Sequence, residues 1–126
     1  MTGKPRNGGE WTEARFTSFV MSQLRGGRWP QKYKAIQAAY IDDGINPETG
    51  RRCKLHRCEE CNDCFPASKM QADHIEPIIP LTGFDSWGAV IERLYCEVDG
   101  FQAMCKPCHK IKTKEENRIR RENKKL

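Results

Sequence analysis

The chain has 126 residues, of which 37% are hydrophobic and 31% charged, so we expect one domain whose modest apolar core is supplemented by bound metal. No apolar run approaches the roughly 20 residues that cross a bilayer, and the first ten residues lack the apolar segment of a signal peptide, which argues against membrane and secreted proteins. The net charge of +5 is modest, and we expect a soluble, cytoplasmic protein with no membrane partner.

The first predicted element is a helix that follows a flexible arm. Residues 1–10 are polar and show no apolar period, which is typical of a loose arm. Thr12 is a suitable N-cap, and apolar residues recur at helical spacing from Phe16 to Leu24. Gly26 and the glycine after it end this amphipathic helix.

A second helix is predicted to begin at Pro30, because proline is favoured in the first turn of a helix. It ends as the chain reaches Asp42, and residues 42–50 are predicted to form a loop. We therefore expect residues 1–50 to form the arm and a helical extension. This extension packs on residues 51–126, within one compact domain overall.

Two short strands are predicted at residues 70–74 and 101–104, where they suit a β-hairpin. Between them, Ser86 can cap a helix that presents one buried face. This face carries Trp87, Val90, Ile91, Leu94 and Tyr95. From about Pro107 onward the chain permits a final helix that is polar almost all round.

The basic charge is concentrated at the end of the sequence. Residues 106–126 carry nine Lys or Arg and three Glu, a net of +6, so the rest of the chain sums to about −1. A basic helix on a near-neutral body suits contact with phosphates, although a solvated charged tail has the same composition. Arg25, Arg28, Lys32 and Lys34, near the two predicted N-terminal helices, could add phosphate contacts.

The seven cysteines indicate zinc, because disulfides are rare in a reducing compartment and an odd number cannot all pair. Two C-x2-C pairs, Cys58 with Cys61 and Cys105 with Cys108, have the spacing of a closed, structural four-cysteine site. The register is open, because Cys61 and Cys64 form another such pair. We prefer Cys58 and Cys61, which leaves Cys53, Cys64 and Cys96 as free or packed thiols.

Two of the three histidines lie beside these cysteine pairs. Asp73 and His74 fall inside the loop that the zinc would close, and His109 directly follows the last cysteine. A lone histidine is more often a surface or core residue, and Asp-His dipeptides are common. The combination with the paired cysteines is the informative feature.

The order C-x2-C, Asp-His-Ile-x-Pro, C-x2-C-His-x2-Lys-Thr, from Cys58 to Thr113, resembles the zinc-containing HNH endonuclease family. The whole chain is similar to small HNH proteins of bacteriophages, through the segments 28–30 and 83–97. The resemblance implies an α+β fold: a small ββα-metal core stapled by the four-cysteine zinc site, with an N-terminal helical extension and a basic C-terminal helix. It also implies a viral source and the cytoplasm of a host cell.

By the same resemblance, the protein hydrolyses phosphodiester bonds in DNA, nicking it or cutting both strands. His74 would be the general base, and Asp73 and His109 the ligands of a catalytic Mg²⁺ or Mn²⁺ ion. A neutral imidazole can take a proton from water, and a hard divalent ion stabilises charge on phosphate oxygens. Lys112 and Thr113 either support the phosphate or lie on the helix surface, and Glu76 is expected to face solvent.

The sequence departs from the family at the asparagine that normally precedes the second C-x2-C pair, where Gly100 stands. In relatives this asparagine holds the loop of the general base. Here Gln102, or backbone contacts from the turn at Asp99 and Gly100, must replace it, or the site has lost cutting power.

Two other functions therefore stay open. One is a non-enzymatic zinc module that binds nucleic acid through the basic helix. The other is an HNH-like scaffold that grips a phage or host protein, with the helical extension as the contact surface.

Overall fold

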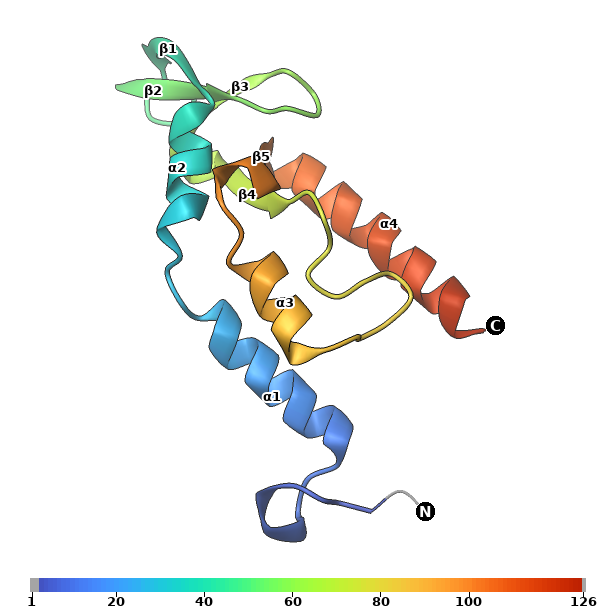
Figure 1. Ribbon diagram of the computed structural model, residues 1–126. Helices are drawn as coiled ribbons and strands as arrows, with labels where there is room; N and C mark the ends of the chain where they lie inside the picture. The colour runs from blue at the N-terminus through green and yellow to red at the C-terminus, as the bar shows by residue number, and fades with distance from the viewer. Residues whose placement is uncertain (1–2, 126) are drawn as a thin grey trace.

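The computed structural model describes residues 3–125, and within them the fold is mixed α+β (Figure 1). Four α-helices accompany two small antiparallel sheets in this part of the chain. This confirms the predicted α+β class. No helix among the described residues is long and apolar enough to cross a membrane.

Both predicted N-terminal helices are present. Helix α1 spans Glu13–Arg25, and the Thr12 hydroxyl caps it by accepting a hydrogen bond from the backbone N–H of Arg15 at 3.2 Å. Helix α2 spans Pro30–Ala38 and has its proline in the first turn, as predicted. The preceding arm has local structure, because Arg6 forms an ion pair with Glu13 at 3.0 Å.

The loop predicted for residues 42–50 is wrong in its first half, where the chain forms strand β1 (Tyr40–Ile45). This strand pairs with β2 (Arg52–Arg57), which pairs in turn with the short β3 (Cys64–Pro66). Almost every residue of β1 is exposed, so the sequence lacks the alternation that marks a half-buried strand. Its strand geometry comes from pairing with β2.

The predicted central pair of strands is confirmed. Strand β4 (Met70–His74) runs antiparallel to β5 (Phe101–Cys105), with Asp73 opposite Gln102. Between them Ser86 caps helix α3 (Trp87–Leu94) by accepting a hydrogen bond at 3.2 Å from the N–H of Ala89.

Part of the predicted buried face of α3 is exposed instead. Val90 and Leu94 are buried, whereas Ile91 is 42% exposed. A single-turn 3-10 helix (Val98–Gly100) leads from α3 into β5, and helix α4 (Lys106–Lys124) follows β5 without a break.

Helix α2 packs on β4 and β5, so the N-terminal extension contributes to the core. Figure 1 shows α2 on one side of β4 and α4 on the other. One buried cluster contains Ala35 of α2 with Ala72 and Phe101 of the two strands. The neighbouring cluster joins Cys58 and Cys105 to apolar residues of β4 and β5, so one cysteine of each pair lies in the core.

Two partly buried hydrogen bonds attach the end of α1 and the start of α2 to the chain just after α3. The Trp29 indole N–H donates to the backbone carbonyl of Cys96 at 2.6 Å, and the Tyr95 hydroxyl donates to the carbonyl of Leu24 at 2.9 Å. The two rings also pack edge to face. The extension is thereby fixed beside the C-terminal end of α3.

Candidate metal centre and catalytic cavity

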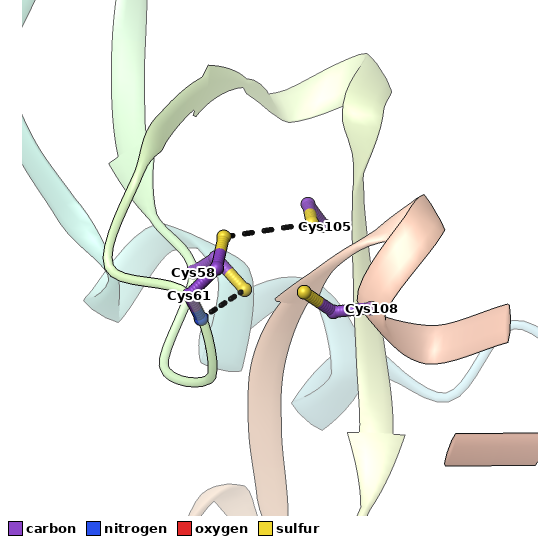
Figure 2. A group of neighbouring side chains, drawn as sticks. All are labelled: Cys58, Cys61, Cys105 and Cys108. Carbon is purple, nitrogen blue, oxygen red and sulfur yellow. Dashed lines mark hydrogen bonds between the residues drawn. The ribbon is translucent and has the colours of Figure 1, made fainter. Parts of the chain in front are cut away.

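The four cysteines of the two C-x2-C pairs lie together (Figure 2), and their sulfurs are all within 4.8 Å of one another. The sulfurs of Cys61 and Cys105 are 3.9 Å apart. Four thiolates bound at about 2.3 Å to one tetrahedral ion would be about 3.8 Å from each other. The cluster could therefore hold a metal ion such as zinc, and its donor set suits that ion.

Local backbone structure presents each pair of sulfurs. Cys58 opens a tight turn in which Asn62 adopts the left-handed conformation, with φ of 65°. The N–H of Glu59 donates to the carbonyl of Ala103 at 2.9 Å, which attaches this turn to β5. The second pair joins the last residue of β5, Cys105, to the first turn of α4, which holds Cys108.

The surroundings of the Cys58 thiol lower its pKa. Its burial raises the pKa of the thiol, but backbone N–H groups, those of Cys61 and Cys105 foremost, outweigh burial and lower this pKa to about 6. The thiolate is the form that binds metal, so this environment favours metal binding at neutral pH. Hydrogen bonding with Cys105 is the main cause that raises the pKa of Cys108.

Cys64 lies outside the cluster. It is exposed on β3, where it pairs with Arg57 of β2. The structure therefore groups the cysteines in the preferred register, with Cys58 and Cys61 as the first pair.

Asp73 is buried at the end of β4, and three side chains contact its carboxylate. His109 Nδ1 lies 3.0 Å from Oδ1, while Gln102 donates to Oδ2 at 3.0 Å. The Lys112 ammonium pairs with Oδ2 and donates to the backbone carbonyl of His74 at 3.0 Å. These contacts fix the carboxylate and connect β4 to β5 and α4.

The contact between Asp73 and His109 is a hydrogen bond in this structure, and its length can be compared with the spacing of two adjacent ligands of one divalent ion. Two donor atoms at about 2.1 Å from an octahedral ion, in adjacent positions, would lie about 3.0 Å apart. The separation between Asp73 Oδ1 and His109 Nδ1 is 3.0 Å. The carboxylate and imidazole are ligand types that Mn²⁺ accepts, and the carboxylate also suits Mg²⁺.

His74 is half-buried beside Asp73, with its ring against that of Phe101 at a centroid distance of 4.6 Å. Its Nε2 lies 3.0 Å from the backbone carbonyl of Leu94. Burial is the main cause that lowers the pKa of His74, and the charge of Lys32 lowers it further. The neutral imidazole is therefore favoured at physiological pH.

Asp73, His74 and His109 line one cavity of about 330 Å³, so the structure brings the three predicted residues together. Thr113 also lines this cavity, whereas Glu76 is exposed outside it. Lys112 reaches Asp73 from α4, which gives it a site contact and not only a helix-surface position.

Gly100 has no room for the asparagine that the family resemblance leads one to expect. A Cβ atom at Gly100 would lie 2.5 Å from the sulfur of Cys96. The carbonyl of Gly100 instead accepts a hydrogen bond from the N–H of Ile75, directly after His74, at 3.0 Å. The sequence offered two replacements for the missing asparagine. The backbone contact from Gly100 holds the loop after His74, whereas Gln102 contacts Asp73.

Several contacts of the site have no direct signal in the sequence. The Leu94 carbonyl belongs to the last turn of α3, where helix carbonyls have no partner within the helix. Arg25, Lys32 and Arg120 also line the cavity. From the sequence, Arg25 and Lys32 could be recognised as cations near the predicted helix ends, but not as part of this cavity.

No family model, curated protein or solved structure matches this chain.

Proposed function

We propose that this protein is a divalent-metal-dependent endonuclease of the HNH type that hydrolyses phosphodiester bonds in double-stranded DNA. The observation that carries the proposal is the shared cavity of Asp73, His74 and His109, in which the Asp73 and His109 donor atoms lie 3.0 Å apart. The neighbouring four-cysteine cluster supports it, because this cluster brings the turn between β2 and β3 next to the start of α4, which carries His109.

His74 is the proposed general base. A backbone carbonyl can only accept a hydrogen bond, so Nε2 carries the hydrogen in its 3.0 Å contact with Leu94. Nδ1 then keeps its lone pair and takes the proton from a water molecule, whose oxygen bonds to the phosphorus while the P–O3′ bond breaks; the 3′ oxygen leaves and is protonated by solvent. The Leu94 carbonyl and the Phe101 ring hold the imidazole in one orientation for this transfer.

Asp73 and His109 are the proposed ligands of the catalytic ion. When bound, Mg²⁺ or Mn²⁺ supplies positive charge that stabilises the phosphate oxygens during bond cleavage. Gln102 and Lys112 orient the Asp73 carboxylate through their contacts with Oδ2. Lys112 also fixes the backbone of His74, so the base and the carboxylate keep their relative positions.

The four-cysteine cluster is proposed to bind zinc in a structural role. Four thiolates fill a tetrahedron and leave no open position for a substrate. Such sites can contribute roughly 10 to 16 kcal/mol to the folding of small domains. Cys58 and Cys105 of the cluster lie in the apolar core, where a bound ion would fix β5 and α4 against the turn at Cys58.

The test is conversion of supercoiled plasmid to nicked or linear DNA by purified, zinc-loaded protein in Mg²⁺, Mn²⁺ or EDTA. We expect cutting in Mg²⁺ or Mn²⁺ that EDTA abolishes. His74→Ala and Asp73→Asn should both lose it. Asp43→Asn is the matched control, because Asp43 is exposed on β1, and this variant should cut like the wild type.

Circular dichroism and metal content would establish that each variant is folded. If the folded, zinc-loaded wild type cuts neither duplex DNA, single-stranded DNA nor RNA, the nuclease proposal is wrong. The remaining functions would then be binding of nucleic acid or of a phage or host protein on the same scaffold.

A further inference from the structure

The cavity of the candidate site extends beyond the strand and the helix that carry Asp73, His74 and His109. Part of its wall comes from the N-terminal extension: Arg25 is the last residue of α1, and Lys32 lies in the first turn of α2. Arg120, from α4, also lines the cavity. Three cations from three helices thus face one space.

These cations have no acidic partner. Within residues 3–125, none of the three forms an ion pair. Lys32 and Arg120 are nevertheless half-buried, where an uncompensated cation is costly. An anion in the cavity would compensate them.

One buried hydrogen-bond donor of Arg120 has no partner among the described residues. Its guanidinium donates to the carbonyl of Ile79 at 2.9 Å and to the side chain of Asn117 at 3.1 Å. Its Nε is buried and has no protein partner. A buried donor without an acceptor is unfavourable, and a phosphate oxygen would satisfy it.

The charge of the cavity favours a phosphate near these residues. The lining contains two carboxylates, those of Asp73 and Glu116. The Asp73 carboxylate already contacts Lys112, Gln102 and His109. The wall formed by α1 and α2 adds positive charge without adding a carboxylate.

A DNA strand whose scissile phosphate lies at His74 carries further phosphates in both directions, one for each 3.4 Å of helix rise. We propose that Arg25, Lys32 and Arg120 bind backbone phosphates next to the scissile one, so the N-terminal extension forms part of the substrate site. This inference rests on the proposed function for the position of the scissile phosphate. The contacts are to the backbone, so they position DNA of any sequence.

The experiment measures binding of a DNA duplex by fluorescence anisotropy over a range of salt concentrations. All proteins carry His74→Ala, and the buffer contains Ca²⁺, so binding is read without cutting. The variants are Arg25→Gln, Lys32→Gln and the combination of both. The matched controls are Arg28→Gln and Lys34→Gln, because these two cations are exposed and do not line the cavity.

Each lost phosphate contact lowers the slope of log Kobs against log salt by about 0.9 for duplex DNA. We therefore expect a decrease of about 0.9 for each single variant and about 1.8 for the double variant, with weaker binding at every salt concentration. The controls should keep the wild-type slope. Lys32→Arg, which keeps the charge, should restore the slope lost in Lys32→Gln.

The outcomes separate this inference from the nuclease proposal. Normal slopes in the Arg25 and Lys32 variants, equal losses in the controls, or no duplex binding by the folded protein would each overturn the inference. A lower slope in these variants supports it, whether or not the wild type cuts plasmid. Plasmid cutting alone decides the nuclease proposal.

Discussion

Gly100→Ala is expected to destabilise the protein, because the new methyl group would overlap with Cys96. An ideal Cβ at position 100 would lie 2.5 Å from Cys96 Sγ and 2.9 Å from its Cβ. Neither side can move freely: Trp29 holds the backbone of Cys96, and the Gly100 carbonyl accepts the N–H of Ile75. Overpacking of this kind costs about 1–3 kcal/mol.

The backbone at Gly100 does not itself require glycine, because its φ is not among the positive values in this chain. The whole cost should therefore come from the contact with Cys96. Cys96→Ala removes the nearer atom, so Gly100→Ala should cost less in that background. The difference is the interaction energy of a double-mutant cycle, about 0.5–3 kcal/mol for residues in contact.

The assay is reversible urea unfolding in zinc-containing buffer, checked by thermal unfolding, where each kcal/mol shifts the Tm by roughly 4 °C at this chain length. Gly88→Ala is the control, since a Cβ there meets no atom within 4 Å and the position lies in α3. It should be neutral or stabilising by up to about 1 kcal/mol, because alanine favours a helix. Equal losses from Gly100→Ala in both backgrounds would refute the steric explanation.

Three further predictions concern the metal centre, the base and the attachment of the extension. Cys58→Ser should lose zinc and Cys64→Ser should keep it, as measured by metal content; zinc retained in Cys58→Ser would refute the grouping of ligands. Burial lowers the pKa of His74, and the neutral imidazole is the proposed base. The value of kcat/KM for DNA should therefore rise with pH through a midpoint below 6.5 and stay high above it. A midpoint above 6.5 would contradict this role. Trp29→Phe should lower the free energy of unfolding, measured in urea, by about 1–3 kcal/mol, because the carbonyl of Cys96 loses its hydrogen-bond donor. A negligible loss would show that water replaces this donor.

Local sequence signals predicted most of the elements around the site. The Thr12 cap, the proline at the start of α2 and the Ser86 cap each act within one helical turn. Short C-x2-C spacing likewise identified cysteines that the structure brings within 4.8 Å of one another. Such signals are readable because their partners lie a few residues apart in the chain.

Apart from the pairing of β4 with β5, the long-range contacts escaped prediction. Strand β1 has no alternating pattern and takes its geometry from β2, so the sequence suggested a loop where the structure has a strand. The contact of His74 with the Leu94 carbonyl uses a backbone group, which carries no side-chain signal. Gln102 became a partner of Asp73 through the register of β4 and β5.

The sequence by itself determined the cysteine pairs and the helices that carry strong caps, because these features depend on residue type and short spacing. Asp73, His74 and His109 were singled out by their order relative to the cysteine pairs, through the resemblance to HNH endonucleases. Only the tertiary structure decided that Arg25 and Lys32 line the same cavity as His74, and that Cys96 occupies the space beside Gly100. Those relations join segments more than forty residues apart, or depend on available volume. They are set by packing of the whole chain, which no local pattern contains.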